Sequence, residues 1–257
     1  MPAMTVRHDL RLALELADVA DAVTMGRYLA SDLQVETKPD MTPVSEADRA
    51  AEQAIRDHLA TTRPDDGVLG EEFGHTEGNG RTWILDPIDA TKNYVRGLPI
   101  WGSLIALEDD GEVTVGVVSS PALGHRWWAA KGEGSWCNAR RLQVSSISRI
   151  EDAQLSYNSL VEFEEQGLGE QGLALSKRCW RTRGLGDFWS FMLIAEGAVD
   201  IAVEPIAAVW DLAPLGIIVE EAGGRFTDLA GDRRIDGGNA VATNGPLHDA
   251  VLEAMQT

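Results

Sequence analysis

The sequence predicts a mixed fold in which helices and sheets pack in layers. Apolar residues recur at helical spacing before residue 60, short antiparallel-looking strands follow between residues 82 and 130, and helices alternate with strands beyond residue 148. Each such element has one apolar face to bury, which favours layers of helices on sheets. The 257 residues suit one compact unit of two closely packed halves, residues 1–140 and 141–257.

Two helices are expected before the first strand. Leucines and valines spaced four, three and four residues apart line one face of the first helix: Leu12, Leu16, Val19 and Val23. The second helix is predicted to start at Thr42-Pro43 and to stop at the polar segment 63–67, with a core face formed by Ala47, Ala51, Ile55 and Leu59. Asp48 would then lie at the start of this helix.

Short strands and helices are expected in the remainder of the chain. The strands of the first half are predicted at residues 82–85, 103–107, 113–118 and 127–130, and Asp109-Asp110-Gly111 forms a hairpin turn between the second and third. In the second half, strands are predicted near residues 155–159, 200–203, 225–227 and 240–243, and helices near 187–196, 211–222 and 246–255. Residues 167–172 match G-x-G-x-x-G, but they follow an acidic segment and no strand, which predicts a loop without a dinucleotide site.

Composition and charge exclude several classes of function. The formal charge of −19 argues against nucleic acid and anionic membranes as partners. No segment has the apolar length of a membrane span and the N-terminus lacks a signal-peptide core, so a cytoplasmic location is expected. Cys137 and Cys179 are too few for a disulfide framework and lack metal-site spacing. For an anionic substrate, bound divalent metals would have to invert the local potential of so acidic a chain.

The segment 86–91 carries the most informative chemistry. Asp86 and Asp89 stand three residues apart directly after the predicted strand 82–85, where two carboxylates can share divalent cations. Thr91 and the backbone N–H groups around it face the same point, where a helix could begin and receive a phosphate. Phosphate ester chemistry is the natural interpretation. The alternative is a simple strand-to-helix turn in which an aspartate caps the helix.

The residues around these aspartates complete a possible reaction site. Pro87 is expected to end the strand and to help turn the Ile88 carbonyl toward the same cavity. Thr91 and Asp48 are candidates for a hydroxyl–carboxylate pair that orients a water molecule for in-line attack on phosphorus, while metals lower the pKa of that water from near 16 toward about 7. For Asp48 the alternative is helix capping or charge pairing on a solvated face.

The aspartate-rich segment resembles the signature of the inositol monophosphatase family of magnesium-dependent, lithium-sensitive phosphatases. Other landmarks of that family recur in order along the chain: Asp48 within 42–48, Glu71-Glu72 after Gly70, and Trp210-Asp211 before the apolar run that ends at 221–224. The resemblance implies an αβαβα sandwich that usually forms homodimers. It also implies two to three Mg²⁺ ions per subunit.

The same resemblance implies a role for each acidic landmark. Asp86 would bridge two metals, Asp89 would hold one of them, and the further ligands would be Glu71, the Ile88 carbonyl oxygen and Asp211. The implied catalytic set is Thr91, Asp48 and Glu72. Ordinary alternatives exist, because Asp211 could cap a helix and an acidic doublet such as Glu71-Glu72 is often only solvated.

Ala90 departs from the family pattern, which has glycine at this position. The resemblance implies that its backbone N–H, with Thr91, helps to bind the substrate phosphate. Alanine keeps that donor but loses ready access to a positive φ, at an expected low cost. We expect activity to be retained, and phosphate affinity to fall if the position requires the conformations of glycine.

Segments 92–101 and 185–190 look most like the histidinol-phosphate phosphatase branch of the family found in actinobacteria. That likeness implies hydrolysis of L-histidinol phosphate to L-histidinol in histidine biosynthesis. The substrate carries an ammonium and an imidazole, for which Asp187 and Glu204 are the candidate binding residues. Two alternatives stay open: an inositol monophosphatase or broad sugar-phosphate phosphatase, and a non-catalytic metal-binding interaction protein.

Overall fold

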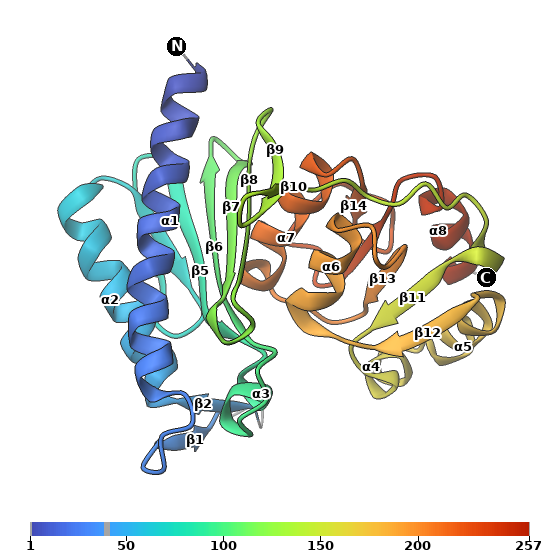
Figure 1. The fold of residues 1–257 in the computed structure, drawn as a ribbon, viewed down its shortest axis with the longest axis horizontal. Helices are drawn as coiled ribbons and strands as arrows, with labels where there is room; N and C mark the ends of the chain where they lie inside the picture. Colours follow the sequence, from blue (N-terminus) through green and yellow to red (C-terminus); the bar gives the residue numbers. More distant parts are fainter. Residues whose placement is uncertain (1, 39–41, 257) are drawn as a thin grey trace.

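Five layers of secondary structure build the molecule. The computed structural model describes residues 2–38 and 42–256. Figure 1 shows α1 and α2 outside a large sheet, α6 and α7 between this sheet and a second one, and α4, α5 and α8 beyond the second sheet. The predicted layered αβαβα fold is therefore confirmed. The helices of these layers are α1 (Pro2–Arg27), α2 (Glu46–Thr62), α4 (Leu160–Glu165), α5 (Gly169–Arg178), α6 (Asp187–Ala195), α7 (Val209–Glu221) and α8 (His248–Gln256).

The buried face of α1 carries smaller side chains than predicted. Val19 and Val23 are only half-buried, although Leu12 and Leu16 lie in the core as expected. The other buried apolar residues of α1 are small, namely Ala13, Ala17 and Ala20, and the polar Asp9 and Thr24 are buried as well. Small side chains let the α1 backbone pack closely on α2 and on the sheet, which turns the valines toward the edge of the contact. Within the described residues, neither α1 nor any other helix is both long and apolar enough to cross a membrane.

The second helix starts later than the predicted Thr42-Pro43. Pro43–Ser45 forms a short strand, β2, which pairs with β1 (Val35–Thr37). Ser45 then caps the helix, and the Asp48 carboxylate accepts a hydrogen bond from the Ser45 N–H at 2.8 Å. The predicted core face is confirmed, since the four residues that form it are buried: Ala47, Ala51, Ile55 and Leu59.

The described strands form an eight-stranded sheet, a five-stranded sheet and the β1–β2 ribbon. The larger sheet is antiparallel except between β3 and β5. Asp110 and Gly111 both have positive φ, as the predicted tight turn between β6 and β7 requires. In spatial order this sheet contains β10 (Arg140–Arg141), β9 (Gly134–Cys137), β8 (His125–Ala130), β7 (Glu112–Ser120), β6 (Gly102–Asp109), β5 (Arg81–Asp89), β3 (Gly67–Gly70) and β4 (Gly74–Thr76).

Strand β5 continues through Pro87, so the prediction that this proline ends the strand was wrong. The pairing of β5 with β6 shifts between Asp86 and Asp89, which places a bulge around the proline. Proline lacks an N–H, and in a bulge no ladder hydrogen bond is lost. Residues three apart in a regular strand point to opposite faces. The bulge removes this restriction and lets both aspartates serve one site.

The smaller sheet mixes parallel and antiparallel pairs. Its spatial order is β12 (Arg181–Gly184), β11 (Gln154–Tyr157), β13 (Ile201–Glu204), β15 (Ala240–Thr243) and β14 (Arg225–Thr227). All except β12 were predicted; β12 is a polar edge strand without apolar alternation. The predicted division of the chain at residues 140 and 141 falls within β10, at the edge of the larger sheet, and stays a prediction.

Residues 167–172 do not form the predicted loop throughout, because α5 begins at Gly169. Glycine has a low helix propensity, which conceals this helix in the sequence. Packing explains Gly172: a Cβ atom there would lie 2.6 Å from the ring of Phe163 on α4. The glycine thus permits α4 and α5 to touch.

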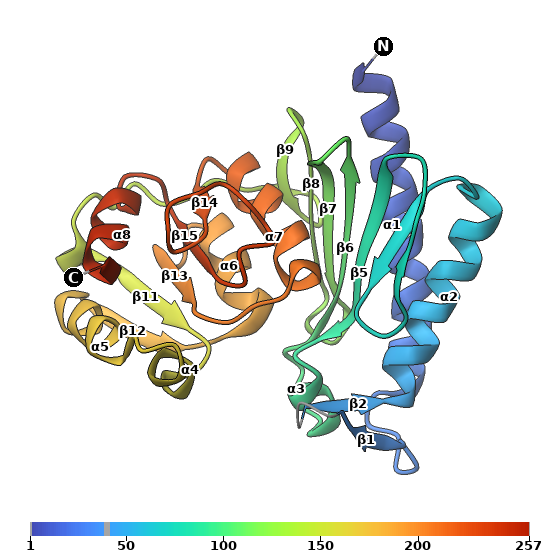
Figure 2. The same ribbon diagram turned by 180° about the vertical axis from the view of Figure 1, so that it is seen from behind.

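Helix α7 connects the two halves of the molecule. Figure 2 shows it lying beside the larger sheet, on the side that faces the smaller one. A Cβ atom on Gly116 of β7 would lie 2.8 Å from the carbonyl oxygen of Pro214 and 2.6 Å from the side chain of Ile217. Glycine at this position therefore allows α7 to pack directly on the strand. The contact fixes where the first turn of α7 meets the larger sheet.

Candidate metal centre

Three carboxylates converge where β5 meets the start of α7. Asp86 and Asp89 lie on β5, and Asp211 lies in the first turn of α7. One oxygen atom from each carboxylate lies within 4.8 Å of those from the other two. The structure thus brings together three of the residues that the sequence singled out, although their role as metal ligands stays a prediction.

The environment of these carboxylates fits a divalent cation. Burial, followed by the charges of neighbouring acids, raises the pKa of Asp86 and of Asp89 well above the usual range. Burial likewise raises the pKa of Asp211 to about 7. A cation bound to these oxygen atoms would offset the free-energy cost of ionising all three groups. Carboxylate oxygens are also the ligands that hard divalent ions prefer.

Backbone N–H groups orient each of the three carboxylates. Asp86 accepts from the N–H of Ile88 at 2.9 Å, and Asp89 accepts from the N–H of Phe188 at 2.8 Å, at the start of α6. Asp211 accepts from the N–H of Ala208 at 2.7 Å. One oxygen of Asp211 therefore caps the helix, as the alternative interpretation predicted. Its second oxygen is left for another ligand, so the capping and metal-binding interpretations are compatible.

Lys38 holds the predicted acidic pair Glu71-Glu72. Its Nζ atom lies 2.7 Å from Glu71 Oε1 and 2.6 Å from Glu72 Oε1. Glu71 is close enough to the metal centre for its charge to raise the pKa of Asp86. Sequence reasoning missed Lys38, because nothing in its local sequence distinguishes it from a surface lysine.

Glu52 on α2 determines the position of the Glu71-Glu72 loop. It is fully buried, and its carboxylate accepts from the N–H of Glu72 at 2.7 Å and from the N–H of Phe73 at 3.2 Å. A Cβ atom on Gly70 would lie 2.0 Å from Glu52 Oε1, which explains the glycine before the two glutamates. The sequence missed Glu52 as well. A signal existed, since Glu52 lies four residues after Asp48 on the apolar face of the helix.

The predicted pair of Thr91 and Asp48 is also brought together. Thr91 begins the short helix α3 (Thr91–Val95), and its hydroxyl lies 2.9 Å from the Ile88 carbonyl oxygen and 3.4 Å from Asp48 Oδ1. The single hydroxyl proton can therefore be donated to either acceptor. Burial raises the pKa of Asp48 to about 6, which still leaves the carboxylate largely ionised above neutral pH.

Ala90 adopts the left-handed conformation, with φ 63° and ψ 45°. For a residue with a Cβ atom this conformation costs roughly 1–2 kcal/mol. Alanine in place of glycine therefore costs more free energy here than expected. Ala90 directly precedes Thr91 and follows Asp89. The strain is therefore located between a candidate metal ligand and the candidate water-orienting hydroxyl.

A cavity of about 70 Å³ opens beside the carboxylate cluster. Asp89 and Asp211 border it, and so do the two residues predicted to bind the alcohol part of the substrate, Asp187 and Glu204. Burial raises the pKa of Asp187 to about 6 and, together with the charge of Glu162, raises the pKa of Glu204 well above its usual range. The cavity is thus lined by four acidic residues.

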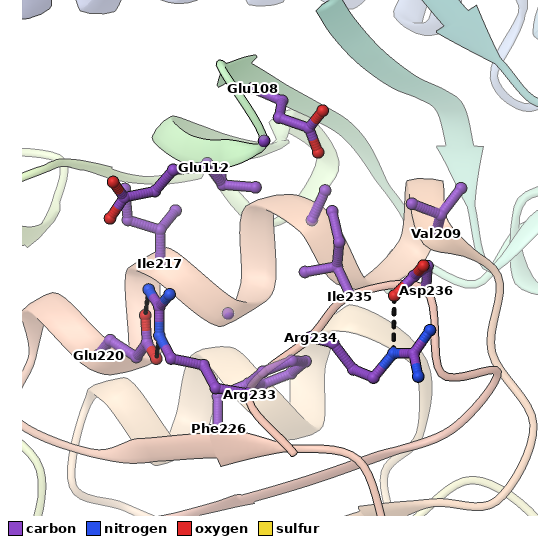
Figure 3. Close-up of a pocket in the computed structure, with 14 residues that line it drawn as sticks. Glu108, Glu112, Val209, Ile217, Glu220, Phe226, Arg233, Arg234, Ile235 and Asp236 are labelled. Carbon is purple, nitrogen blue, oxygen red and sulfur yellow. Dashed lines mark hydrogen bonds and ion pairs between the residues drawn. The ribbon is translucent and has the colours of Figure 1, made fainter.

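A larger cavity of about 270 Å³ lies between the β6–β7 hairpin and α7, and it does not fit an anionic substrate (Figure 3). Its two arginines are each held by a carboxylate: Arg233 by Glu220 at 2.6 Å and Arg234 by Asp236 at 2.8 Å. Among the described lining residues, none belongs to the predicted site. The smaller cavity is therefore the candidate substrate pocket.

Comparisons with known proteins agree with one another on the family that this chain resembles. The model of the inositol monophosphatase family matches residues 6–257. A histidinol-phosphatase of Mycobacterium tuberculosis is 56% identical over 95% of this chain and 96% of its own length, and one of Streptomyces coelicolor is 54% identical over 95% of both chains. The solved structure of an inositol monophosphatase from Zymomonas mobilis superposes with a TM-score of 0.87, at 33% identity and 98% coverage of both chains.

The metal-free protein should lose thermal stability as the pH rises from about 4 to about 7. Folding raises the pKa of Asp48 and Asp187 to about 6 and that of Asp211 to about 7, from about 4 in the unfolded chain. The folded protein therefore binds more protons than the unfolded chain in this range, and its stability falls as the pH increases. Melting temperatures in EDTA at pH 5 and pH 8 measure the effect. Mg²⁺ should restore more stability at pH 8 than at pH 5, and equal gains at both values would contradict the cluster.

Replacing Ala90 with glycine should stabilise the fold by roughly 1 kcal/mol, because glycine adopts positive φ without a Cβ clash. Urea unfolding at fixed Mg²⁺ concentration measures the change. Ala122→Gly is a matched control, since Ala122 is half-buried and does not have positive φ. The control should lose stability, and a similar loss in Ala90→Gly would show that the backbone at residue 90 is unstrained.

Proposed function

The chain belongs to the inositol monophosphatase family, and we propose that it is a histidinol-phosphatase, which hydrolyses L-histidinol phosphate to L-histidinol and phosphate. Relatives of that name at 54–56% identity support this reaction. The observation that carries the proposal is the single cavity bordered both by Asp89 and Asp211 and by Asp187 and Glu204. An ester bound there would place its phosphate near the first pair and its nitrogen-bearing alcohol near the second.

The proposed ligands of two to three Mg²⁺ ions are Asp86, Asp89, Asp211, Glu71 and the Ile88 carbonyl oxygen. When bound, the cations would lower the pKa of water and neutralise negative charge that develops on the phosphate. Lys38 contacts only Oε1 of Glu71, at 2.7 Å, so Glu71 can contribute its Oε2 atom while Lys38 remains paired with both glutamates. Homodimer formation stays a prediction from the resemblance, and a cytoplasmic location stays a prediction from the sequence.

Thr91 and Asp48 are proposed to orient the attacking water. When the Thr91 hydroxyl donates its proton to Asp48, its oxygen lone pairs are free to accept a hydrogen bond from water. The 3.4 Å separation leaves room for this bond to shorten when the substrate arrives. Asp48 is held in place by the N–H and the hydroxyl of Ser45, both of which donate to Oδ2. The backbone N–H groups of Ala90 and Thr91 are the proposed phosphate contacts.

Two other functions make different predictions. An inositol monophosphatase or broad sugar-phosphate phosphatase would need neutral hydrogen-bonding partners at the alcohol end of the pocket. The half-buried Asp187 and the buried Glu204 favour a substrate with cationic nitrogen groups. A non-catalytic metal-binding protein would not need a water-orienting pair. The contact between Thr91 and Asp48 supports such a pair and so favours an enzyme.

A panel of phosphate esters tests the proposal directly. Phosphate release from histidinol phosphate, inositol 1-phosphate and glucose 6-phosphate should be measured with Mg²⁺, with Mg²⁺ and Li⁺, and with EDTA. We expect kcat/KM for histidinol phosphate to exceed the other values by about tenfold or more. The other two esters lack a cationic group that could pair with the acids of the pocket. EDTA should abolish turnover. Equal values would support the broad phosphatase, and no release from any ester would support the non-catalytic protein.

Thr91→Ala should lower kcat by on the order of 10²-fold, because the hydroxyl orients the nucleophile. Metal binding, measured by the Mg²⁺-dependent rise in melting temperature, should persist. Thr114→Ala is a matched control: Thr114 is half-buried and its hydroxyl also donates to a backbone carbonyl, that of Leu107. An unchanged kcat in Thr91→Ala would mean that the metals activate water without this side chain.

A further inference from the structure

Two buried carboxylate oxygens near the substrate pocket lack a hydrogen-bond donor. Glu204 on β13 is 5% exposed, and its Oε1 atom has no partner among the described residues. The same holds for Oε2 of Glu162, in the first turn of α4. A buried carboxylate oxygen without a donor is costly, so such atoms suggest that a group absent from the free chain completes the site.

Each of the two carboxyl groups affects the pKa of the other, so the two lie close together. Glu162 is held in place by Asn158, whose side-chain nitrogen donates to Oε1 at 2.9 Å. Asn158 and Glu204 both border the cavity that also contains Asp89 and Asp211. The pair is therefore adjacent to the proposed substrate pocket, although the two glutamates are separated by 42 positions in the sequence.

The charges around this pair favour a cation. Asp187 and Lys92 act electrostatically on the pair, so that three carboxylates face one ammonium group. Asp89 and Glu165 add further negative charge nearby. The single positive charge of Lys92 can balance the negative charge of only one of these carboxylates. A positively charged nitrogen group with N–H donors would supply both the missing charge and the missing hydrogen bonds.

We propose that Glu162 is a specificity-determining residue that, together with Glu204, binds a cationic nitrogen group on the alcohol part of the substrate. A protonated amine or imidazole has the required chemistry. The inference rests on the proposed phosphatase function and deepens it, because it adds a residue from α4 to the substrate pocket. Glu204 meets the ligand from the sheet side, and Glu162 completes the acceptor pair from the helix.

A purely structural role for Glu162 makes a different prediction. An acidic side chain in the first turn of a helix is stabilised by the unpaired N–H groups there. If this were its whole role, Glu162→Gln would lower stability and leave the ranking of substrates unchanged. The preference between a cationic and a neutral ester therefore separates the two roles.

The experiment compares Glu162→Gln with the unaltered enzyme on histidinol phosphate and on glycerol 2-phosphate, both with saturating Mg²⁺. We expect kcat/KM for histidinol phosphate to fall by about ten- to a hundredfold, mainly through KM, and by at least about fivefold more than for the neutral ester. Glu162→Asp retains the charge and should recover part of the loss. Glu164→Gln is the matched control, because Glu164 is an exposed carboxylate on the same helix and is not among the charges that act on the pair.

Each outcome separates the inference from the function on which it rests. Equal losses on the two esters, or an unchanged preference in a variant with normal melting temperature, would overturn the role of Glu162 and leave the phosphatase assignment intact. If Glu162→Gln fails to fold, the same comparison with Glu162→Ala, which also removes the carboxylate, decides, and an unchanged preference there again overturns the role. An unaltered protein that hydrolyses neither ester would overturn the proposed function and this inference together.

Discussion

The repulsion between Asp86, Asp89 and Asp211 is the constraint on which the rest of this structure depends. Three carboxylates with oxygen atoms within 4.8 Å of one another do not remain ionised in a buried site without a counter-charge. Several parts of the fold are needed to hold them there. A bulge lets β5 direct two aspartates to one site, and the close contact of α7 with Gly116 brings the third from the other half of the chain. The fold therefore supplies the rigidity against which a cation can bind.

The junction between the halves is also where positioning is most precise. The N–H of Phe188, at the start of α6, donates to Asp89, so that α6 orients a carboxylate of β5 that is a candidate metal ligand. Glu52 performs a comparable function for the Glu71-Glu72 loop, and Gly70 leaves space for its carboxylate. In the carboxylate cluster, a backbone N–H occupies one oxygen each of Asp86 and Asp211. The second oxygen of each is left for a cation, as preorganised sites require.

An acidic protein can bind a phosphate ester if its carboxylates are divided between two tasks. At one end of the pocket, the proposed metal ligands would hold cations that attract the phosphate. At the other end, Glu204 and Glu162 retain unpartnered oxygens that suit a cationic alcohol. One cavity borders both groups of acids, so a zwitterionic ester would find complementary charge along its whole length. A neutral sugar phosphate would find it only at the phosphate.

The local pattern of the chain determined the layered fold class, the core face of α2, the β6–β7 turn, and the aspartates that converge at the metal centre. These features depend on periodicity, turn chemistry and motif spacing, which are written in neighbouring residues. The path of β5 through Pro87, the start of α5 at Gly169 and the left-handed Ala90 depended on tertiary structure, because packing and pairing partners override local propensity there. The roles of Lys38, Glu52 and Glu162 also depended on tertiary structure. Their significance arises from residues remote in the sequence, and only the folded chain brings those residues within the few ångströms over which hydrogen bonds and charge pairs act.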